Sequence, residues 1–329
     1  MIDSNILKEL KSGKNLLAFS AGVDSSALFY ILVNSNIEFD IALVNYGTRD
    51  ESDLEEEWAK ELAKSYNKKA FITKAPKFSS NFEAKAREFR YNFFKNIIAK
   101  EGYCNLITAH QLNDKLEWLL MRLGKGAGVS ELSGMSKIYC NSSYNIIRPL
   151  LDYTKDELLR YLKSNHYRYF VDSSNFDKKY ERNRFRPIVN ELLKDGKSGF
   201  VKSFEILKKE SDILRSGYEM ILREKELIVA KVYNKQLLDS AASNYLKELG
   251  YLISGKERQE LLKSNSLVAG RRWAVELVED MLFISPYITI TLPKEFKEFC
   301  RVKKIPPKVR GYIYKESLQN KIEELKSSN

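Results

Sequence analysis

The stretch NLLAFSAGVDSS, Asn15 to Ser26, joins a short apolar run to the start of a helix. Asn15–Ser20 ends in small residues, as a buried strand often does, and Val23–Val33 is typical of a helix. A strand–turn–helix junction leaves free backbone N–H groups at the positive end of the helix, and both features suit a phosphate. Gly22 lets the backbone approach such a group closely. The junction therefore predicts a phosphate-binding loop in an α/β domain.

Asp24 is the unusual residue of this loop. Its carboxylate would repel a bare phosphate, so it indicates a magnesium ion shared with a bound nucleotide. Ser20, Ser25 and Ser26 add hydroxyl donors, although serine and aspartate also cap helices for stability alone. A motif of six residues does not by itself decide between the two interpretations.

The loop differs from two common phosphate loops, because it has neither Gly-Lys-Ser/Thr nor Gly-x-Gly-x-x-Gly. It resembles the SGGxDS loop of the N-type ATP pyrophosphatases, which bind ATP and cleave it between the α and β phosphates. Ala21 replaces the first glycine, and an alanine would be strained if that position required a positive φ. The resemblance implies that ATP is bound by Ser20, Ala21, Gly22, Val23, Asp24 and Ser25.

Strand-like and helix-like segments alternate through the first half of the chain. Further strand-like runs are Asp40–Asn45, Ala70–Thr73, Asn105–His110 and Asn145–Leu151. Helix-like segments lie between most of them, so the strands are expected to pair in parallel with helices on both faces. We therefore expect a doubly wound, mainly parallel sheet, and the resemblance to the ATP pyrophosphatases implies that it is of the adenine nucleotide α-hydrolase type. Ligands of such a sheet bind at the carboxyl ends of its strands, here after Phe19, Val44 and Thr108.

The second half changes character from about Lys155, where long charged helices begin. Phe200–Lys231 reads as nearly unbroken helix, and the segments beyond Tyr233 mix helices with short strand-like runs. We therefore predict an N-terminal catalytic domain at 1–199, a helical connector at 200–233, and a small mixed α+β domain at 234–329.

Composition excludes several classes of protein. The 329 residues are 43% hydrophobic and carry a formal net charge of +11, which suits a polyanionic partner but also an ordinary lysine-rich surface. Three scattered cysteines, Cys104, Cys140 and Cys300, and two histidines give neither a disulfide framework nor a zinc cluster. The start of the chain does not resemble a signal peptide, and no apolar run approaches about 20 residues. We expect a cytoplasmic protein without a membrane partner.

Asp114 and Glu117 follow a strand-like run and lie three residues apart in a helical segment, so both carboxylates share one face. Such a pair beside a triphosphate can hold magnesium or a cationic substrate. A solvated acidic face would show the same spacing. Their position just past a strand favours the functional interpretation.

Five ordered elements within residues 16–192 resemble the tRNA(Ile)-lysidine synthases. They are LVNYGTRDES (43–52), EAKAREFRY (83–91), TAHQLNDKLEWLLMRLGKGAGVSELSGM (108–135), NIIRPLL (145–151) and FVDSSNFDKKYERNRFR (170–186). This chain departs from the family at Tyr46, where the family usually has His, at Asn113, where it has Asp, and at Trp118, where it has Thr.

The resemblance implies a carbon–nitrogen ligase that modifies tRNA(Ile) with a CAU anticodon. The wobble cytidine would be adenylated with ATP and then attacked by the ε-amine of L-lysine, giving lysidine, AMP and pyrophosphate. Codon reading would change from AUG to AUA, and charging from Met to Ile. The matching positions imply catalytic roles for Asp24, Arg90, Asp114, Glu117 and Arg182, and Mg²⁺ binding by Asp24 and Asp114.

Two basic segments are candidates for tRNA contact. One carries Lys178, Lys179, Arg184 and Arg186 next to Tyr180 and Phe185, a combination that suits phosphates and unstacked bases as well as an ordinary charged helix start. The other, RVKKIPPKVR at 301–310, resembles the KIPPW-x-R element of longer family members, although Lys308 replaces the aromatic residue. The resemblance implies that the small domain at 234–329 binds tRNA. We predict tRNA contacts from Lys178, Lys179, Arg184, Arg186, Lys304, Lys308 and Arg310.

Two alternatives stay open at this point. A tRNA thiolase of the same superfamily would usually need paired cysteines, which this chain lacks. A non-catalytic RNA-binding homologue with a decayed ATP site would account for Ala21, Tyr46 and Asn113. The sequence also leaves open whether the protein forms a homodimer.

Overall fold

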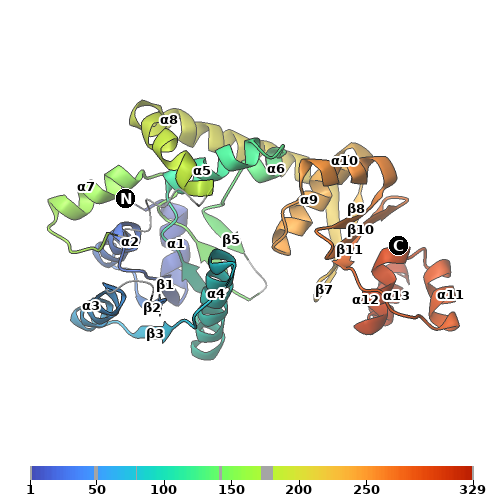
Figure 1. The fold of residues 1–329 in the computed structure, drawn as a ribbon, viewed down its shortest axis with the longest axis horizontal. Coiled ribbons are helices and arrows are strands. Elements are labelled where there is room, and N and C mark those ends of the chain that lie inside the picture. The colour runs from blue at the N-terminus through green and yellow to red at the C-terminus, as the bar shows by residue number, and fades with distance from the viewer. Residues whose placement is uncertain (1, 48–50, 79, 141–142, 172–180, 328–329) are drawn as a thin grey trace. The chain divides into compact units, whose positions relative to one another are not determined.

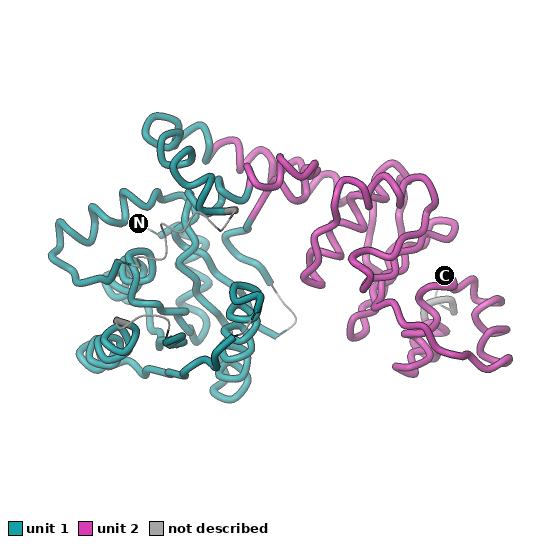
Figure 2. Tube along the Cα trace, in the orientation of Figure 1, with its two compact units in different colours: residues 1–118, 135–201 teal, residues 119–134, 202–329 magenta. Residues whose placement is uncertain are grey.

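The computed structural model describes residues 2–47, 51–78, 80–140, 143–171 and 181–327 (Figure 1). The chain divides into two compact units (Figure 2). Unit 1 comprises residues 1–118 and 135–201, and unit 2 comprises residues 119–134 and 202–329. A short internal segment therefore groups with the C-terminal part of the chain.

Unit 1 contains a six-stranded sheet in the order β3-β2-β1-β4-β6-β5. Its strands are β1 (Asn15–Ala18), β2 (Phe39–Asn45), β3 (Ala70–Lys74), β4 (Asn105–Ile107), β5 (Ile138–Cys140) and β6 (Asn145–Ile147). All neighbouring strands are parallel except the pair of β5 and β6. The predicted mainly parallel sheet is confirmed.

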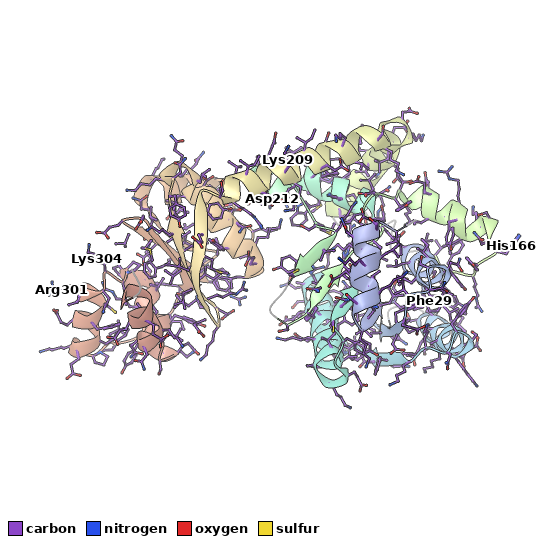
Figure 3. All side chains as sticks on the ribbon, turned by 180° about the vertical axis from the view of Figure 1, so that it is seen from behind. Phe29, His166, Lys209, Asp212, Arg301 and Lys304 are labelled. Carbon is purple, nitrogen blue, oxygen red and sulfur yellow. The ribbon has the colours of Figure 1, made fainter. Side chains whose placement is uncertain are left out.

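Helices cover both faces of this sheet. The helices of unit 1 are α1 (Ser4–Ser12), α2 (Val23–Asn34), α3 (Glu51–Ser65), α4 (Phe82–Glu101), α7 (Lys155–Ser164), and the first parts of α5 (Leu112–Leu123) and α8 (Glu181–Arg215). Successive strand residues point to opposite faces, which explains the two cores. Leu17 belongs to the core that includes residues of α1, α2, α3 and α7, whereas its neighbour Leu16 belongs to the core that includes residues of α4. Phe29 of α2 is fully buried in the first core (Figure 3).

Unit 2 contains a five-stranded antiparallel sheet in the order β7-β8-β11-β10-β9. Its strands are β7 (Tyr218–Glu224), β8 (Leu227–Val232), β9 (Ser266–Ala269), β10 (Trp273–Val278) and β11 (Met281–Pro286). Helices α9 (Leu238–Glu248) and α10 (Gly255–Ser264) contribute to the core on one face. Helices α11 (Lys294–Val302), α12 (Arg310–Lys315) and α13 (Gln319–Ser327) contribute to the core on the other. The short α6 (Val129–Leu132) also belongs to this unit.

The prediction of nearly unbroken helix over 200–231 is wrong. Helix α8 ends at Arg215, and the hairpin β7–β8 follows as part of the second sheet. Lys225 takes a positive φ of 54° at the turn, and every residue of 227–230 is fully buried. β8 pairs with β11, and its alternate side chains are buried in the cores on the two faces of the sheet, so distant partners override local helix propensity. The predicted connector at 200–233 is therefore partly a β-hairpin.

Among the helices that the structure describes, none combines the length and the apolar character needed to cross a bilayer.

Candidate active site

The predicted phosphate loop lies between the end of β1 and the start of α2. Two serine hydroxyls stabilise the backbone of the loop. Ser25 Oγ donates to Gly22 O at 3.2 Å, and Ser26 Oγ donates to Ala21 O at 3.1 Å. The backbone N–H of Phe170 also donates to Ala21 O, at 2.9 Å. The N–H of Ser26 donates to Gly22 O, so the preceding amides open the helix, where intrahelical acceptors are lacking. The loop thus has the anion-binding geometry of a helix N-terminus.

Ala21 has a φ of 61°, the left-handed conformation that disfavours residues with a Cβ. This is the strain that the sequence led us to expect if the position required a positive φ. The side chain of Ala21 is fully buried within the first core of unit 1. Packing of the methyl group therefore offsets part of the conformational cost.

Asp24, in the first turn of α2, has a carboxylate oxygen that lacks a hydrogen-bond partner among the described residues. This oxygen, Oδ1, is buried. Burial raises the pKa of Asp24 to about 7, and the negative charge of Asp114 adds to that shift. Lys155 and Arg182 oppose it. A cation bound at Oδ1 would satisfy the oxygen and relieve the repulsion from Asp114.

Asp114 and Glu117, on α5, both pair with Arg182 of α8. Arg182 Nη2 donates to Asp114 Oδ1 and Arg182 Nε donates to Glu117 Oε2, while Gln111 N donates to Asp114 Oδ2 at 2.9 Å. The Glu117 side chain is only 3% exposed. Burial lowers the pKa of Arg182, but the two carboxylates outweigh it, and the net pKa is raised. Arg182 thus connects the predicted catalytic residues, because it pairs with Asp114 and Glu117 and also acts on the pKa of Asp24.

Arg90, the fifth predicted catalytic residue, lies on α4 against Tyr46 at the end of β2. Burial raises the pKa of the Tyr46 phenol, and the hydrogen-bonded Arg90 opposes that rise. Tyr46 Oη donates to Ala86 O at 3.1 Å, which ties this strand end to α4. The structure pairs Arg90 with Tyr46 and not with the α5 carboxylates.

Asn113, where the family has an aspartate, makes structural hydrogen bonds. Its Nδ2 donates to Asn190 Oδ1 at 2.8 Å, and its Oδ1 accepts from the backbone N–H of Lys155 at 3.1 Å. The side chain is buried. It therefore links the start of α5 to α7 and α8.

The predicted tRNA-binding residues lie in different settings. Lys178 and Lys179 fall outside the described residues. Arg184 is exposed on α8, whereas Arg186 Nε lies 3.4 Å from Glu117 Oε1. In unit 2, Lys304 pairs with Glu279 at the surface (Figure 3). Of the other two, the Lys308 Nζ donates to Ser266 Oγ at 2.8 Å, and the Arg310 guanidinium donates twice to Ile305 O. Their tRNA contacts stay predictions.

Sequence reasoning assigned no function to His110 and Arg148. His110 follows β4, its Nδ1 lies 2.9 Å from Thr108 Oγ1, and burial lowers its pKa to about 4, so the ring is neutral at neutral pH. Arg148 directly follows β6. The strand-end rule could have identified Arg148, because β6 is a parallel strand like β1, β2 and β4.

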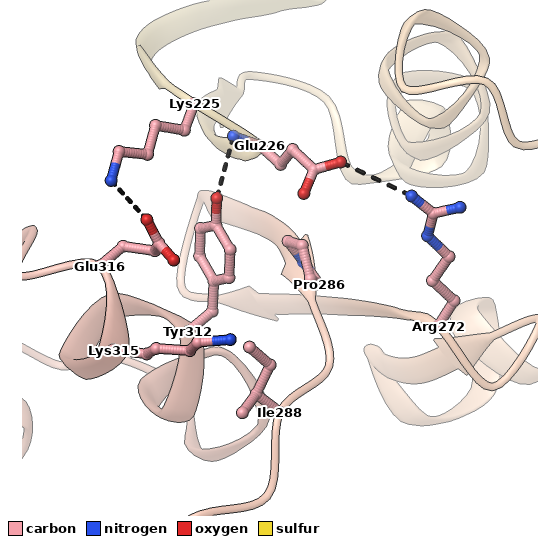
Figure 4. Close-up of a pocket in the computed structure, with 8 residues that line it drawn as sticks. All are labelled: Lys225, Glu226, Arg272, Pro286, Ile288, Tyr312, Lys315 and Glu316. Carbon is pink, nitrogen blue, oxygen red and sulfur yellow. Dashed lines mark hydrogen bonds and ion pairs between the residues drawn. The ribbon is translucent and has the colours of Figure 1, made fainter.

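A separate pocket of about 510 Å³ lies in unit 2, between the β7–β8 turn and α12 (Figure 4). Lys225 pairs with Glu316 in it, and Arg272 Nη2 lies 3.6 Å from Glu226 Oε1. These mutually paired charges include none of the predicted site residues. We therefore assign the candidate active site to the carboxyl edge of the first sheet.

Known proteins resemble this chain both in fold and in sequence over nearly its whole length. A family model described as a PP-loop domain matches residues 3–193. The tRNA(Ile)-lysidine synthase of Wolinella succinogenes is 45% identical over 93% of this chain and 94% of its own length. The enzyme of that name from Campylobacter jejuni is 44% identical over 96% and 97%, and that from Helicobacter pylori is 39% identical over 95% and 93%.

One solved structure supports the fold alone. The U34-tRNA thiolase NcsA from Methanococcus maripaludis, determined with its [4Fe-4S] cluster, aligns with a TM-score of 0.52. The alignment covers 62% of this chain and 77% of that chain, at 17% identity. The two proteins therefore share the overall fold of the aligned region.

Proposed function

The chain belongs to the tRNA(Ile)-lysidine synthase family, and on this premise we propose which of its residues carry out the reaction. It is an ATP-using ligase that modifies tRNA(Ile). In our proposal the acceptor is the wobble cytidine of the CAU anticodon, and the donor is the ε-amine of L-lysine. Lysidine, AMP and pyrophosphate are the products.

Activation is needed because the carbonyl at position 2 of cytosine is a poor electrophile whose oxygen would have to leave as oxide. That oxygen attacks the α-phosphorus of ATP, and the bond to pyrophosphate breaks. The lysine amine then attacks carbon 2, and AMP leaves with the oxygen. Adenylation thus replaces a poor leaving group, oxide, by a good one, AMP, which the amine then displaces.

The amides at the start of α2 and the Ser20 and Ser25 hydroxyls are the proposed cradle for the phosphates of ATP. The buried, unsatisfied Oδ1 of Asp24 and the neighbouring Asp114 fit a magnesium ion. Such an ion supplies charge neutralisation for the departing pyrophosphate. Within the described residues no cluster of three or more acidic, histidine or cysteine ligands is present, so phosphate oxygens and water would complete the coordination.

The lysine amine must lose a proton before it attacks, since its unperturbed pKa is about 10.4. Asp114 or Glu117 is the proposed acceptor of the ammonium group and of its proton. Arg182 neutralises both carboxylates in the structure described here. An arriving ammonium group would compete for the same oxygens, freeing the guanidinium to stabilise negative charge on the phosphates. Arg90, beside Tyr46, is proposed to act on the same charge.

The observation that supports this proposal most strongly is the buried Asp24 oxygen, which has no hydrogen-bond partner among the described residues and lies within electrostatic range of Asp114. The test is incubation of the protein with ATP, radiolabelled lysine and total tRNA. We expect label only on tRNA(Ile) with a CAU anticodon, and AMP and pyrophosphate only when tRNA is present. A thiolase would leave lysine unincorporated, and a non-catalytic homologue would release no AMP.

A further inference from the structure

Arg148 lies at the carboxyl end of β6, at the same sheet edge as the candidate active site. Its Nη1 donates to Ser136 O at 2.9 Å. Its Nε is buried and has no hydrogen-bond partner among the described residues. The Nε–H donor is thus left for a group that the described residues do not supply.

The charge of Arg148 also lacks an acidic partner in the described part of the chain. The ionisable neighbours that act on its pKa are Arg87 and two tyrosines, and none is a carboxylate. Other partly buried arginines differ in this respect, since Arg182 pairs with Asp114 and Glu117, and Arg258 pairs with Glu131 and Asp239. Desolvating a cation without an anion is costly, so the arrangement favours an anion from elsewhere.

Arg148 belongs to a small basic group. Arg87, exposed on α4, stacks over Tyr91 with its guanidinium carbon 4.7 Å from the ring centroid. Both arginines act on the neutral His110, and so does Asp114 with the opposite sign. The ends of β4 and β6 are joined at this point, because Thr108 N donates to Ile147 O at 2.9 Å. The basic group and Asp114 of α5 therefore both lie within electrostatic range of His110.

We propose that Arg148 and Arg87 form an oxyanion-binding site that holds a substrate of the ligation reaction. A guanidinium binds carboxylates and phosphates through paired hydrogen bonds, and two cations flanking a neutral imidazole leave a net positive site. The inference rests on the proposed function, which brings two suitable oxyanions to this edge. One is the α-carboxylate of lysine, whose ammonium group would lie at Asp114 and Glu117. The other is a backbone phosphate beside the wobble nucleotide.

The test compares Arg148→Met, Arg148→Lys and Arg87→Met in the full-length protein. Lys100→Met is the matched control, because it removes the same charge from an exposed position in the last turn of the same helix, α4. Binding of L-lysine, of L-lysinamide and of tRNA is measured directly, by calorimetry and by titration at several salt concentrations. These readouts do not require turnover, so they remain valid even if the wild-type protein makes no lysidine.

For a lysine carboxylate, we expect both Met variants to weaken lysine binding by about 10- to 100-fold while lysinamide binding stays unchanged. For a tRNA phosphate, we expect unchanged lysine binding, about tenfold weaker tRNA binding and a salt slope reduced by about one. Arg148→Lys should restore only part of the loss, because an ammonium group lacks the planar fork.

Unchanged binding of both lysine and tRNA in the two Met variants would overturn the site. Because Arg148 also holds the Ser136 carbonyl, its Met variant is first checked for cooperative unfolding. If it does not fold, Arg87→Met decides, since that side chain is exposed. Failure of the wild type to ligate lysine, with the binding losses still present, would count against the proposed function alone.

Discussion

Arg182 donates a hydrogen bond to Asp114 although 68 residues separate them in the chain. The contact joins the start of α8 to the start of α5, directly after β4. A salt bridge in this position keeps the acidic side chain oriented while it holds no substrate. It also implies that a cationic substrate must displace, or share, the guanidinium.

Asp114→Ala is expected to abolish the tRNA-dependent release of pyrophosphate while leaving the fold intact. The side chain is partly exposed, and Arg182 keeps Glu117 as a partner, so little stability is lost. Pyrophosphate release is measured with tRNA and lysine present. Asp212→Ala, which removes an exposed acid paired with Lys208, is the control. Near-normal turnover by the Asp114 variant would remove this residue from the site.

Asp24→Asn is expected to stabilise the metal-free protein while removing its activity. Burial raises the pKa of Asp24 to about 7 in the folded state, against an ordinary value near 3.8. The unfolded chain therefore ionises first, so stability falls as pH rises from about 4 to 7 and then levels off. We expect the gain from the substitution to reach roughly 1–3 kcal/mol at pH 8 and to be smaller at pH 5.

This gain is measured by urea unfolding in the presence of a chelator, at both pH values. Adding magnesium and ATP should stabilise the wild type but not the Asn variant, because only the carboxylate can bind the ion strongly. An Asn variant that is less stable than wild type at pH 8 would contradict the assigned cost of the buried charge.

Ala21→Gly is expected to change the free energy of unfolding by less than about 1 kcal/mol. Glycine relieves the positive φ, which is worth about 1–2 kcal/mol, but it gives up a buried methyl group and increases the entropy of the unfolded chain. Urea unfolding checks the balance. A loss of several kcal/mol would show that packing of the methyl group dominates at this position.

Arg258→Met is expected to cost about 3–5 kcal/mol of stability, because it removes the Arg258 guanidinium from the buried Glu131 carboxylate. The Glu131 side chain is 0% exposed, and Arg258 also donates to Asp239 and Ser243, each at 2.9 Å. Arg301→Met, which breaks an exposed pair with Glu298, is the control and should cost less than about 1 kcal/mol (Figure 3). Equal losses of unfolding free energy in the two variants would contradict the assigned cost of removing Arg258 from the buried Glu131.

Arg184→Ala is expected to weaken tRNA binding and to reduce its salt slope by about one, because this exposed guanidinium is available to a phosphate. Arg186→Ala should change the slope less, since its Nε lies 3.4 Å from Glu117. Filter binding across a salt series separates the two. Identical slopes for wild type and the Arg184 variant would direct the search for tRNA contacts elsewhere.

The sequence predicted the elements whose cause is local. The apolar run before Ser20 and the helix after Gly22 gave the phosphate loop, and alternation of strands with helices gave the parallel sheet. The hairpin at 218–232 was missed, because its charged and apolar residues suit a helix as well as a strand. Only the pairing of β8 with β11 decides between them.

By itself, then, the chain determined its phosphate loop and the pattern of its first sheet, since backbone geometry and periodicity act over a few residues. Tertiary structure alone decided that Arg182 neutralises Asp114 and Glu117, that Asp24 keeps an unsatisfied oxygen, and that Arg148 lacks an acidic partner among the described residues. Those properties depend on which distant groups share a desolvated space. Charge interactions of that kind are set by the fold and leave no periodic trace in the sequence.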